Sequence, residues 1–95
     1  KRGLAFEIDI DKVMQIWEEQ RGRCALSGVL MQAAKDGKGH RGKDLNVSLD
    51  RIDQEKGYLY SPRNVQLVCL GVNIMKHTME ESDLFWWCQN IVDHK

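Results

Sequence analysis

The segment from residue 47 to residue 76 constrains the fold more than any other part of the chain. The stretch NVSLDRI alternates apolar and polar residues, with Val47 and Leu49 pointing inward as in a half-buried strand. A second apolar stretch, VQLVCL, follows after a connection that Gly57 and Pro62 interrupt. Two such stretches predict an antiparallel hairpin. The residues GVNIMKHTM, which come next, predict a helix packed on it.

The two ends of the chain predict further helices. Val13, Ile16 and Trp17 recur at helical spacing in the N-terminal part, and the residues RGR end that pattern. The stretch SDLFWWCQNIVDH predicts a last helix, with Ser82 as its N-cap. An isolated hairpin is marginally stable, so these helices are expected to cover its remaining faces. The predicted fold class is therefore α+β: a hairpin plus helix, flanked by N- and C-terminal helices.

Composition limits the alternatives. The 95 residues suit one domain over positions 1–95, and the first residue, Lys1, favours a domain excised from a longer chain. Because 14 basic and 14 acidic residues balance, any binding site for a polyanion must come from local clustering. No apolar run approaches the roughly 18 residues of a membrane span. Three cysteines without a disulfide spacing favour a reducing, cytoplasmic environment.

The order CALSG, SLDRID, GY and NVQLVCLGVN.MK resembles the HNH, or His-Me finger, endonucleases. It is similar in particular to phage-type members with a Ser-x-Asp-Arg-Ile-Asp core. The resemblance covers roughly positions 24 to 77. It implies a ββα-metal finger, in which the hairpin and its helix clamp one divalent cation, DNA as the partner, and the cytoplasm of a bacterial or phage-infected cell as the location.

The resemblance also implies roles for three residues. Asp50 and Asn73 would be metal ligands, and Asn64 would be the amide that fixes the loop. Asn64 and Asn73 are nine residues apart, the spacing that the family pattern has. Carboxylate and amide oxygens suit Mg²⁺ or Mn²⁺, which could polarise a phosphoryl oxygen and stabilise the leaving 3′ oxygen. The plainer alternatives are a solvated loop acid at Asp50 and a turn or cap residue at Asn64.

Arg51 stands where the family has its general-base His. Arginine does not deprotonate in proteins, so it cannot take a proton from water. Three substitutes remain open. Asp53 could accept the proton or serve as a further ligand, a histidine could approach, or metal-bound hydroxide could attack with little help from a base. Of His40 and His77, the latter is better placed, four residues beyond Asn73 on the same expected helix face.

Arg51 has two further interpretations. Its guanidinium could hold the scissile phosphate or stabilise charge in the transition state, or it could form a salt bridge with Asp53 or Asp50. Other cations are expected to contact DNA phosphates, although exposed lysines are usually only a solubilising surface. The residues with this expected DNA-binding role are Lys76, Arg63, Lys56, Arg41 and Lys43.

Many HNH proteins brace the finger with zinc bound by two Cys-x-x-Cys knuckles. In this chain the corresponding pairs are Cys24 with Ser27 and Cys69 with Val72. Serine and valine cannot complete a tetrahedral thiolate site, so we predict no structural zinc. The two cysteines are expected to pack as small apolar groups. The stability that zinc supplies elsewhere would come from aromatic residues of the terminal helices, namely Trp17, Phe85 and Trp87.

The expected function is therefore a metal-dependent DNA endonuclease that hydrolyses or nicks phosphodiester bonds, with Asp50, Arg51, Asp53 and His77 as catalytic candidates. Its first alternative is a catalytically inactive nucleic-acid-binding module of the same fold. The second is a helical interaction domain that neither binds DNA nor responds to divalent ions.

Overall fold

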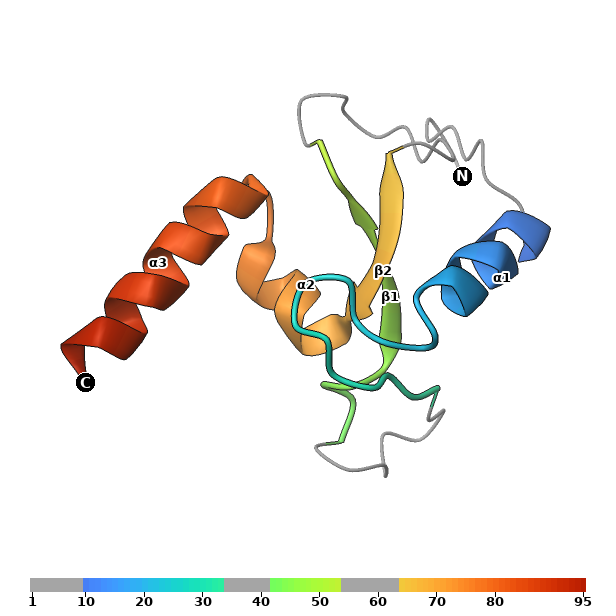
Figure 1. Cartoon of the computed structure of the whole chain (residues 1–95), viewed down its shortest axis with the longest axis horizontal. Coiled ribbons are helices and arrows are strands. Elements are labelled where there is room, and N and C mark those ends of the chain that lie inside the picture. The colour runs from blue at the N-terminus through green and yellow to red at the C-terminus, as the bar shows by residue number, and fades with distance from the viewer. Residues whose placement is uncertain (1–9, 34–41, 54–63) are drawn as a thin grey trace.

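The computed structural model describes residues 10–33, 42–53 and 64–95. The elements follow in the order α1 (Ile10–Glu19), β1 (Val47–Arg51), β2 (Val65–Cys69), α2 (Leu70–Lys76) and α3 (Glu81–His94). Figure 1 shows the hairpin at the centre, with α1 on one side and α2 and α3 on the other. The predicted α+β fold, a hairpin and helix flanked by terminal helices, is confirmed.

The two strands form an antiparallel pair whose faces differ in character. In the register of this pair Asp50 lies opposite Gln66 and Ser48 opposite Val68. Successive side chains of a strand point to opposite faces. Val47 and Leu49 therefore share the face that packs against the hydrophobic core. Ser48 and Asp50 share the other face, which α2 covers with hydrogen bonds from its own side chains.

The core lies between β2, α1 and the segment that follows α1. Ile16 of α1 packs there, with Trp17 partly buried beside it. The amide of Ala25 donates to the carbonyl of Leu67 at 3.0 Å, and the Gln20 side chain bonds both backbone groups of Leu67. The remaining buried members of this cluster are Cys24, Met31, Val65, Val68 and Cys69. The segment after α1 is thus fastened to β2 by its backbone as well as by apolar contacts.

The segment expected to be a turn and a strand, CALSGVLM, contains the turn but no strand. It is held by isolated bridges, Arg23 with Leu30 and Gln32 with Asn46. The RGR sequence does end α1, because Arg21 and Gly22 have positive φ angles of 58° and 71°. At Gly22 an added Cβ would lie 3.0 Å from the Trp17 ring, so the glycine also permits a close approach.

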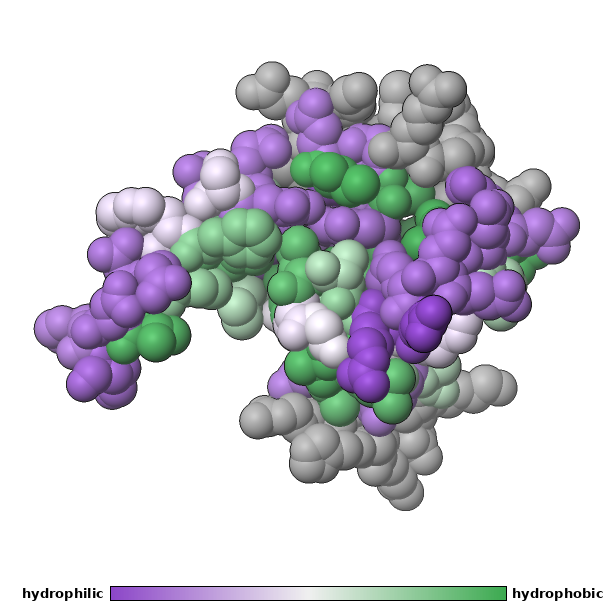
Figure 2. Space-filling model, viewed as in Figure 1, coloured by the Kyte–Doolittle hydropathy of each residue, from purple (hydrophilic) through white to green (hydrophobic). Residues whose placement is uncertain are grey.

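Both expectations about the last helix need correction. The helix begins at Glu81 with Glu80 as N-cap, so Ser82 lies inside its first turn. The helix extends away from the hairpin (Figure 1), and its apolar side chains remain at the surface among polar ones (Figure 2). Phe85 and Trp87, predicted to cover the core, are 49% and 52% exposed. Only Leu84 of this helix is buried, because α3 packs on the short α2 and not on the sheet.

None of the helices in the described parts of the chain has the length and apolar character needed to cross a membrane.

Candidate metal centre

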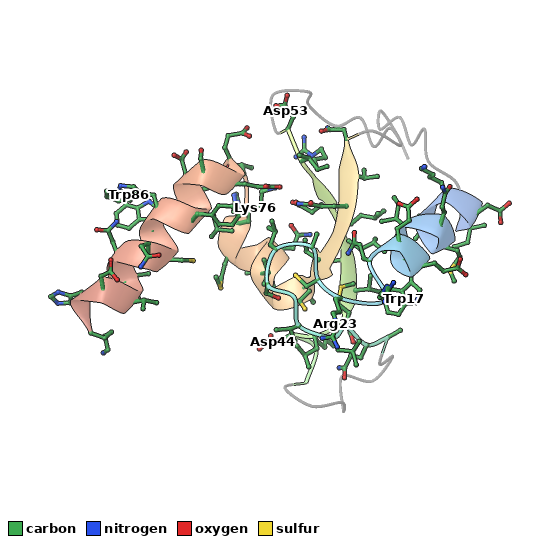
Figure 3. The ribbon with its side chains drawn as sticks, in the orientation of Figure 1. Trp17, Arg23, Asp44, Asp53, Lys76 and Trp86 are labelled. Carbon is green, nitrogen blue, oxygen red and sulfur yellow. The ribbon has the colours of Figure 1, made fainter. Side chains whose placement is uncertain are left out.

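A buried ion pair occupies the position where the sequence analysis expects a metal ligand. The Lys76 ammonium lies 2.7 Å from Oδ2 of Asp50, and the side chains are 0% and 2% exposed. The same ammonium donates to the carbonyl of Arg51 at 2.8 Å. Figure 3 shows Lys76 reaching from α2 toward the hairpin. Removing two charges from water is costly, and the short pair together with the second hydrogen bond offsets that cost.

The network around this pair extends to α3. The Gln66 amide nitrogen donates to Oδ2 of Asp50 at 2.9 Å and to Oε2 of Glu81 at 2.8 Å. Gln66 can reach Asp50 because the two residues are cross-strand partners on the same face of the hairpin. One amide therefore links a buried carboxylate on β1 to a carboxylate in the first turn of α3.

Asn73 lies on the same side of β1. Its Nδ2 atom donates to Oγ of Ser48 at 2.7 Å and to the carbonyl of Leu49 at 3.0 Å. Since a carbonyl oxygen can only accept, the nitrogen of the carboxamide must face the strand. The two N–H groups are thereby both used, and Oδ1 is the atom that remains for another partner.

Asp50 and Asn73 are brought to one interface by two periodicities. Ser48 and Asp50 alternate onto the α2-facing side of β1. Asn73 and Lys76, three residues apart, share the face of α2 that meets it. Among the described residues, every recorded partner of the Asp50 carboxylate bonds Oδ2. Within the described residues, Oδ1 of Asp50 and Oδ1 of Asn73 therefore both lack a hydrogen-bond partner.

The donor set is small. Within residues 10–33, 42–53 and 64–95, no cluster of three or more His, Cys, Asp or Glu side chains could hold a metal ion. Asp50 and Asn73 would supply one carboxylate oxygen and one amide oxygen, both hard donors suited to Mg²⁺ or Mn²⁺. Phosphate oxygens and water would have to complete the coordination.

The expected role of Lys76 needs correction. It was expected to contact DNA, but its side chain is fully buried and its ammonium is engaged inside the protein. The sequence did contain a signal for this burial. Lys76 lies three residues after Asn73, so the two side chains share one face of the helix. Gln66 was also missed, although pairing the two predicted strands places a long amide near Asp50.

Asn64, directly before β2, is bonded to the residues that directly follow β1. Its Oδ1 accepts from the amide of Asp53 at 2.8 Å, and its Nδ2 donates to the carbonyl of Asp53 at 3.3 Å. Its own carbonyl accepts from the amide of Ile52 at 2.8 Å. The side chain is buried. These are the contacts that an amide needs if it is to fix the loop that follows β1.

We expect Asn64→Ala to lower the free energy of unfolding by about 1–3 kcal/mol, because it leaves the partly buried amide of Asp53 without its acceptor. Urea unfolding followed by circular dichroism measures the change. Asn90→Ala, at an exposed amide on α3, is the matched control and should stay within about 0.5 kcal/mol of the parent. Equal effects of the two substitutions would show that Asn64 has no special structural role.

Arg51 and Asp53 do not share the α2-facing side of β1 with the Asp50 carboxylate. Strand alternation directs Arg51 to the face opposite Asp50, whose ion pair is with Lys76. Asp53 is half-buried beyond the end of β1, where its backbone is bonded by Asn64. In Figure 3 Asp53 lies at the end of the hairpin where β1 leads toward β2, apart from Lys76.

His77 is close to Asn73, although not on a continuing helix as expected. The helix α2 ends at Lys76, and His77 is its C-cap with φ 52°. The imidazole is exposed, with Nδ1 3.4 Å from Oγ1 of Thr78. Asn73, His77 and Thr78 nevertheless line the same open cavity of about 310 Å³. An exposed imidazole and a candidate metal-binding amide thus share one depression of the surface.

Of the cations expected to contact DNA, Lys43 is exposed in a turn before β1. Arg41, Lys56 and Arg63 lie outside the described residues, as does the alternative base His40.

Comparison with known proteins adds no relative: no family model matches the sequence, and no curated protein or solved structure gives a significant match.

Proposed function

We propose that this chain is a metal-dependent DNA endonuclease of the HNH type, which hydrolyses or nicks phosphodiester bonds. One observation carries the proposal. Asp50 and Asn73 both lie at the interface of β1 and α2, with Oδ2 of the acid and Nδ2 of the amide already engaged by the protein. The remaining oxygens are of the kind that bind a hard divalent cation.

The donor chemistry fits Mg²⁺ or Mn²⁺ bound mainly in the presence of substrate. Lys76 offsets the charge of Asp50, so the protein alone offers the cation little net negative charge. Phosphate oxygens of DNA would supply both charge and further ligands. The cation, when bound, polarises the phosphoryl oxygen and stabilises the leaving 3′ oxygen.

Other residues of the chain have separate tasks in this proposal. His77 accepts the proton of the attacking water, since an imidazole is a common general base and this one lines the same cavity as Asn73. Lys76 and Gln66 hold the Asp50 carboxylate in one orientation through Oδ2. Arg51 and Lys43 contact phosphates along the DNA and do not act on the scissile bond.

Nicking of supercoiled plasmid DNA tests the proposal. We expect cleavage in Mg²⁺ or Mn²⁺ that chelation with EDTA stops. His77→Gln should lower the rate about 10²-fold or more, because a positioned general base contributes at least that much. His94→Gln, at the exposed end of α3, is the control and should leave the rate unchanged. Equal rates for both variants would remove His77 from the mechanism.

The rival function is a nucleic-acid-binding module without catalysis. It is favoured by the ion pair of Lys76 and Asp50, in which the ammonium balances the carboxylate charge without a metal ion. This rival predicts that the protein binds the plasmid and leaves it intact at every concentration of either metal. DNA binding without cleavage would therefore replace the endonuclease by the binding module, and failure to bind DNA would exclude both.

A further inference from the structure

Cys24 and Cys69 are distant in sequence and adjacent in the fold. Both side chains belong to the same hydrophobic cluster, and the neighbouring Cys24 raises the pKa of the Cys69 thiol. They are 2% and 3% exposed. The neighbouring backbone bond from Ala25 to Leu67, 3.0 Å long, holds the segment after α1 against β2. The fold therefore holds the two cysteines in one buried cluster.

The surroundings of the two sulfurs are unequal. Burial raises the pKa of the Cys24 thiol, but hydrogen bonds from Ser27 and from backbone groups outweigh burial and leave this pKa lowered. The Ser27 amide, for example, lies 3.4 Å from the Cys24 sulfur. For Cys69, burial and the neighbouring Cys24 both raise the pKa of the thiol. The Cys24 thiol therefore loses its proton more readily than the Cys69 thiol.

A cavity gives small molecules access to this pair. It has a volume of about 400 Å³ and opens to the surface, and its lining includes Ser27, Cys69 and Val72. Cys69 therefore forms part of the wall, and Ser27 connects the wall to the sulfur of Cys24. The space is ample for a hydroperoxide.

We propose that Cys24 and Cys69 form a dithiol site that a hydroperoxide converts into an intrachain disulfide. The Cys24 thiolate attacks a peroxide oxygen, the O–O bond breaks, and water or an alcohol leaves after taking up a proton. The sulfur of Cys69 then attacks the resulting sulfenic acid: the S–S bond forms, the S–O bond breaks, and water departs. Two thiols thereby give two electrons and two protons to one hydroperoxide.

The disulfide would act on the part of the fold that carries the candidate metal centre. Cys69 is both the last residue of β2 and the N-cap of α2. A covalent bond to Cys24 would fasten the start of α2 to the segment after α1. The third thiol, Cys88, is only half-buried, on α3, and has no place in this pair.

Peroxide treatment of the full chain tests the site directly. After exposure to hydrogen peroxide, the protein is unfolded, alkylated with iodoacetamide and digested without reduction. Mass spectrometry should find the peptides of Cys24 and Cys69 joined, with the loss of two hydrogen atoms, and Cys88 alkylated. Treatment with dithiothreitol should release the two peptides. This proposal does not depend on nuclease activity.

Two variants test which cysteines form the disulfide. Cys88→Ser should form the same cross-link to the same extent. Cys69→Ala should form none and should leave a Cys24 sulfenic acid that dimedone traps. Should Cys69→Ala not fold, the parent chain and Cys88→Ser still decide the result. Three alkylated thiols after peroxide, a cross-link that contains Cys88, or oxidation of Cys24 to sulfinic acid without a cross-link would each overturn the proposal.

Discussion

Replacing Lys76 by Met should lower the free energy of unfolding by about 3–5 kcal/mol, the usual cost of removing one partner of a buried ion pair. Methionine is unbranched like lysine and only one heavy atom shorter, so it keeps most of the apolar contacts of the side chain. Among the described residues, the variant leaves the buried carboxylate of Asp50 with the Gln66 amide as its only partner, and it removes the ammonium from the carbonyl of Arg51. Urea unfolding of parent and variant, compared at equal m-values, measures the loss.

The double variant Asp50→Asn with Lys76→Met separates the ion pair from packing. It removes both charges at similar volume, so most of the lost stability should return. Lys43→Met, at an exposed lysine, is the control and should change the free energy of unfolding by no more than about 0.5 kcal/mol. A Lys76→Met protein as stable as this control would mean that the pair contributes nothing, contrary to its burial and its 2.7 Å distance.

The second large effect concerns Asn73. We expect Asn73→Ala to reduce both Mn²⁺ affinity in the presence of DNA and the rate of plasmid nicking by more than about 10²-fold. The loss of an outer-shell partner already costs 10–100-fold at metal sites, and Asn73 is proposed to bind the cation itself. Free Mn²⁺ followed by electron paramagnetic resonance measures the affinity.

Ser48→Ala provides the matched control for this effect. It removes one acceptor of the Asn73 amide and leaves both proposed metal-binding oxygens in place. Ser48→Ala loses one hydrogen bond and Asn73→Ala loses two, at a structural cost of about 1 kcal/mol for each bond. A merely structural Asn73 predicts similar losses of Mn²⁺ affinity in the two variants, whereas a ligand predicts a loss in Asn73→Ala that clearly exceeds the outer-shell effect of Ser48→Ala.

The parts of the fold that sequence predicts well are those that depend on local pattern. Alternation at Val47 and Leu49 identified the core-facing side of β1, and the RGR sequence identified the end of α1. The position of Asn64 at the start of β2 could also be anticipated, because only the order of strand, loop and strand is required. Each of these features is encoded within a few neighbouring residues.

What the sequence could not reveal are relations between distant elements. Lysine is normally exposed, so the burial of Lys76 follows only once α2 is placed across β1. The apolar stripe of α3 predicted burial, but amphipathicity does not specify a partner, and Phe85 remains exposed. Cys24 and Cys69 likewise resembled separate small apolar residues, and their neighbourhood follows only from the packing of the segment after α1 on β2, where Ala25 donates to Leu67.

A crystal of the protein with DNA, soaked in MnCl₂ and measured at the manganese absorption edge, tests the metal centre most directly. The account predicts one anomalous peak between β1 and α2, with Oδ1 of Asp50 and Oδ1 of Asn73 about 2.0–2.6 Å from it. A map with no peak there, with Lys76 still bound to Asp50 and DNA in place, would contradict it.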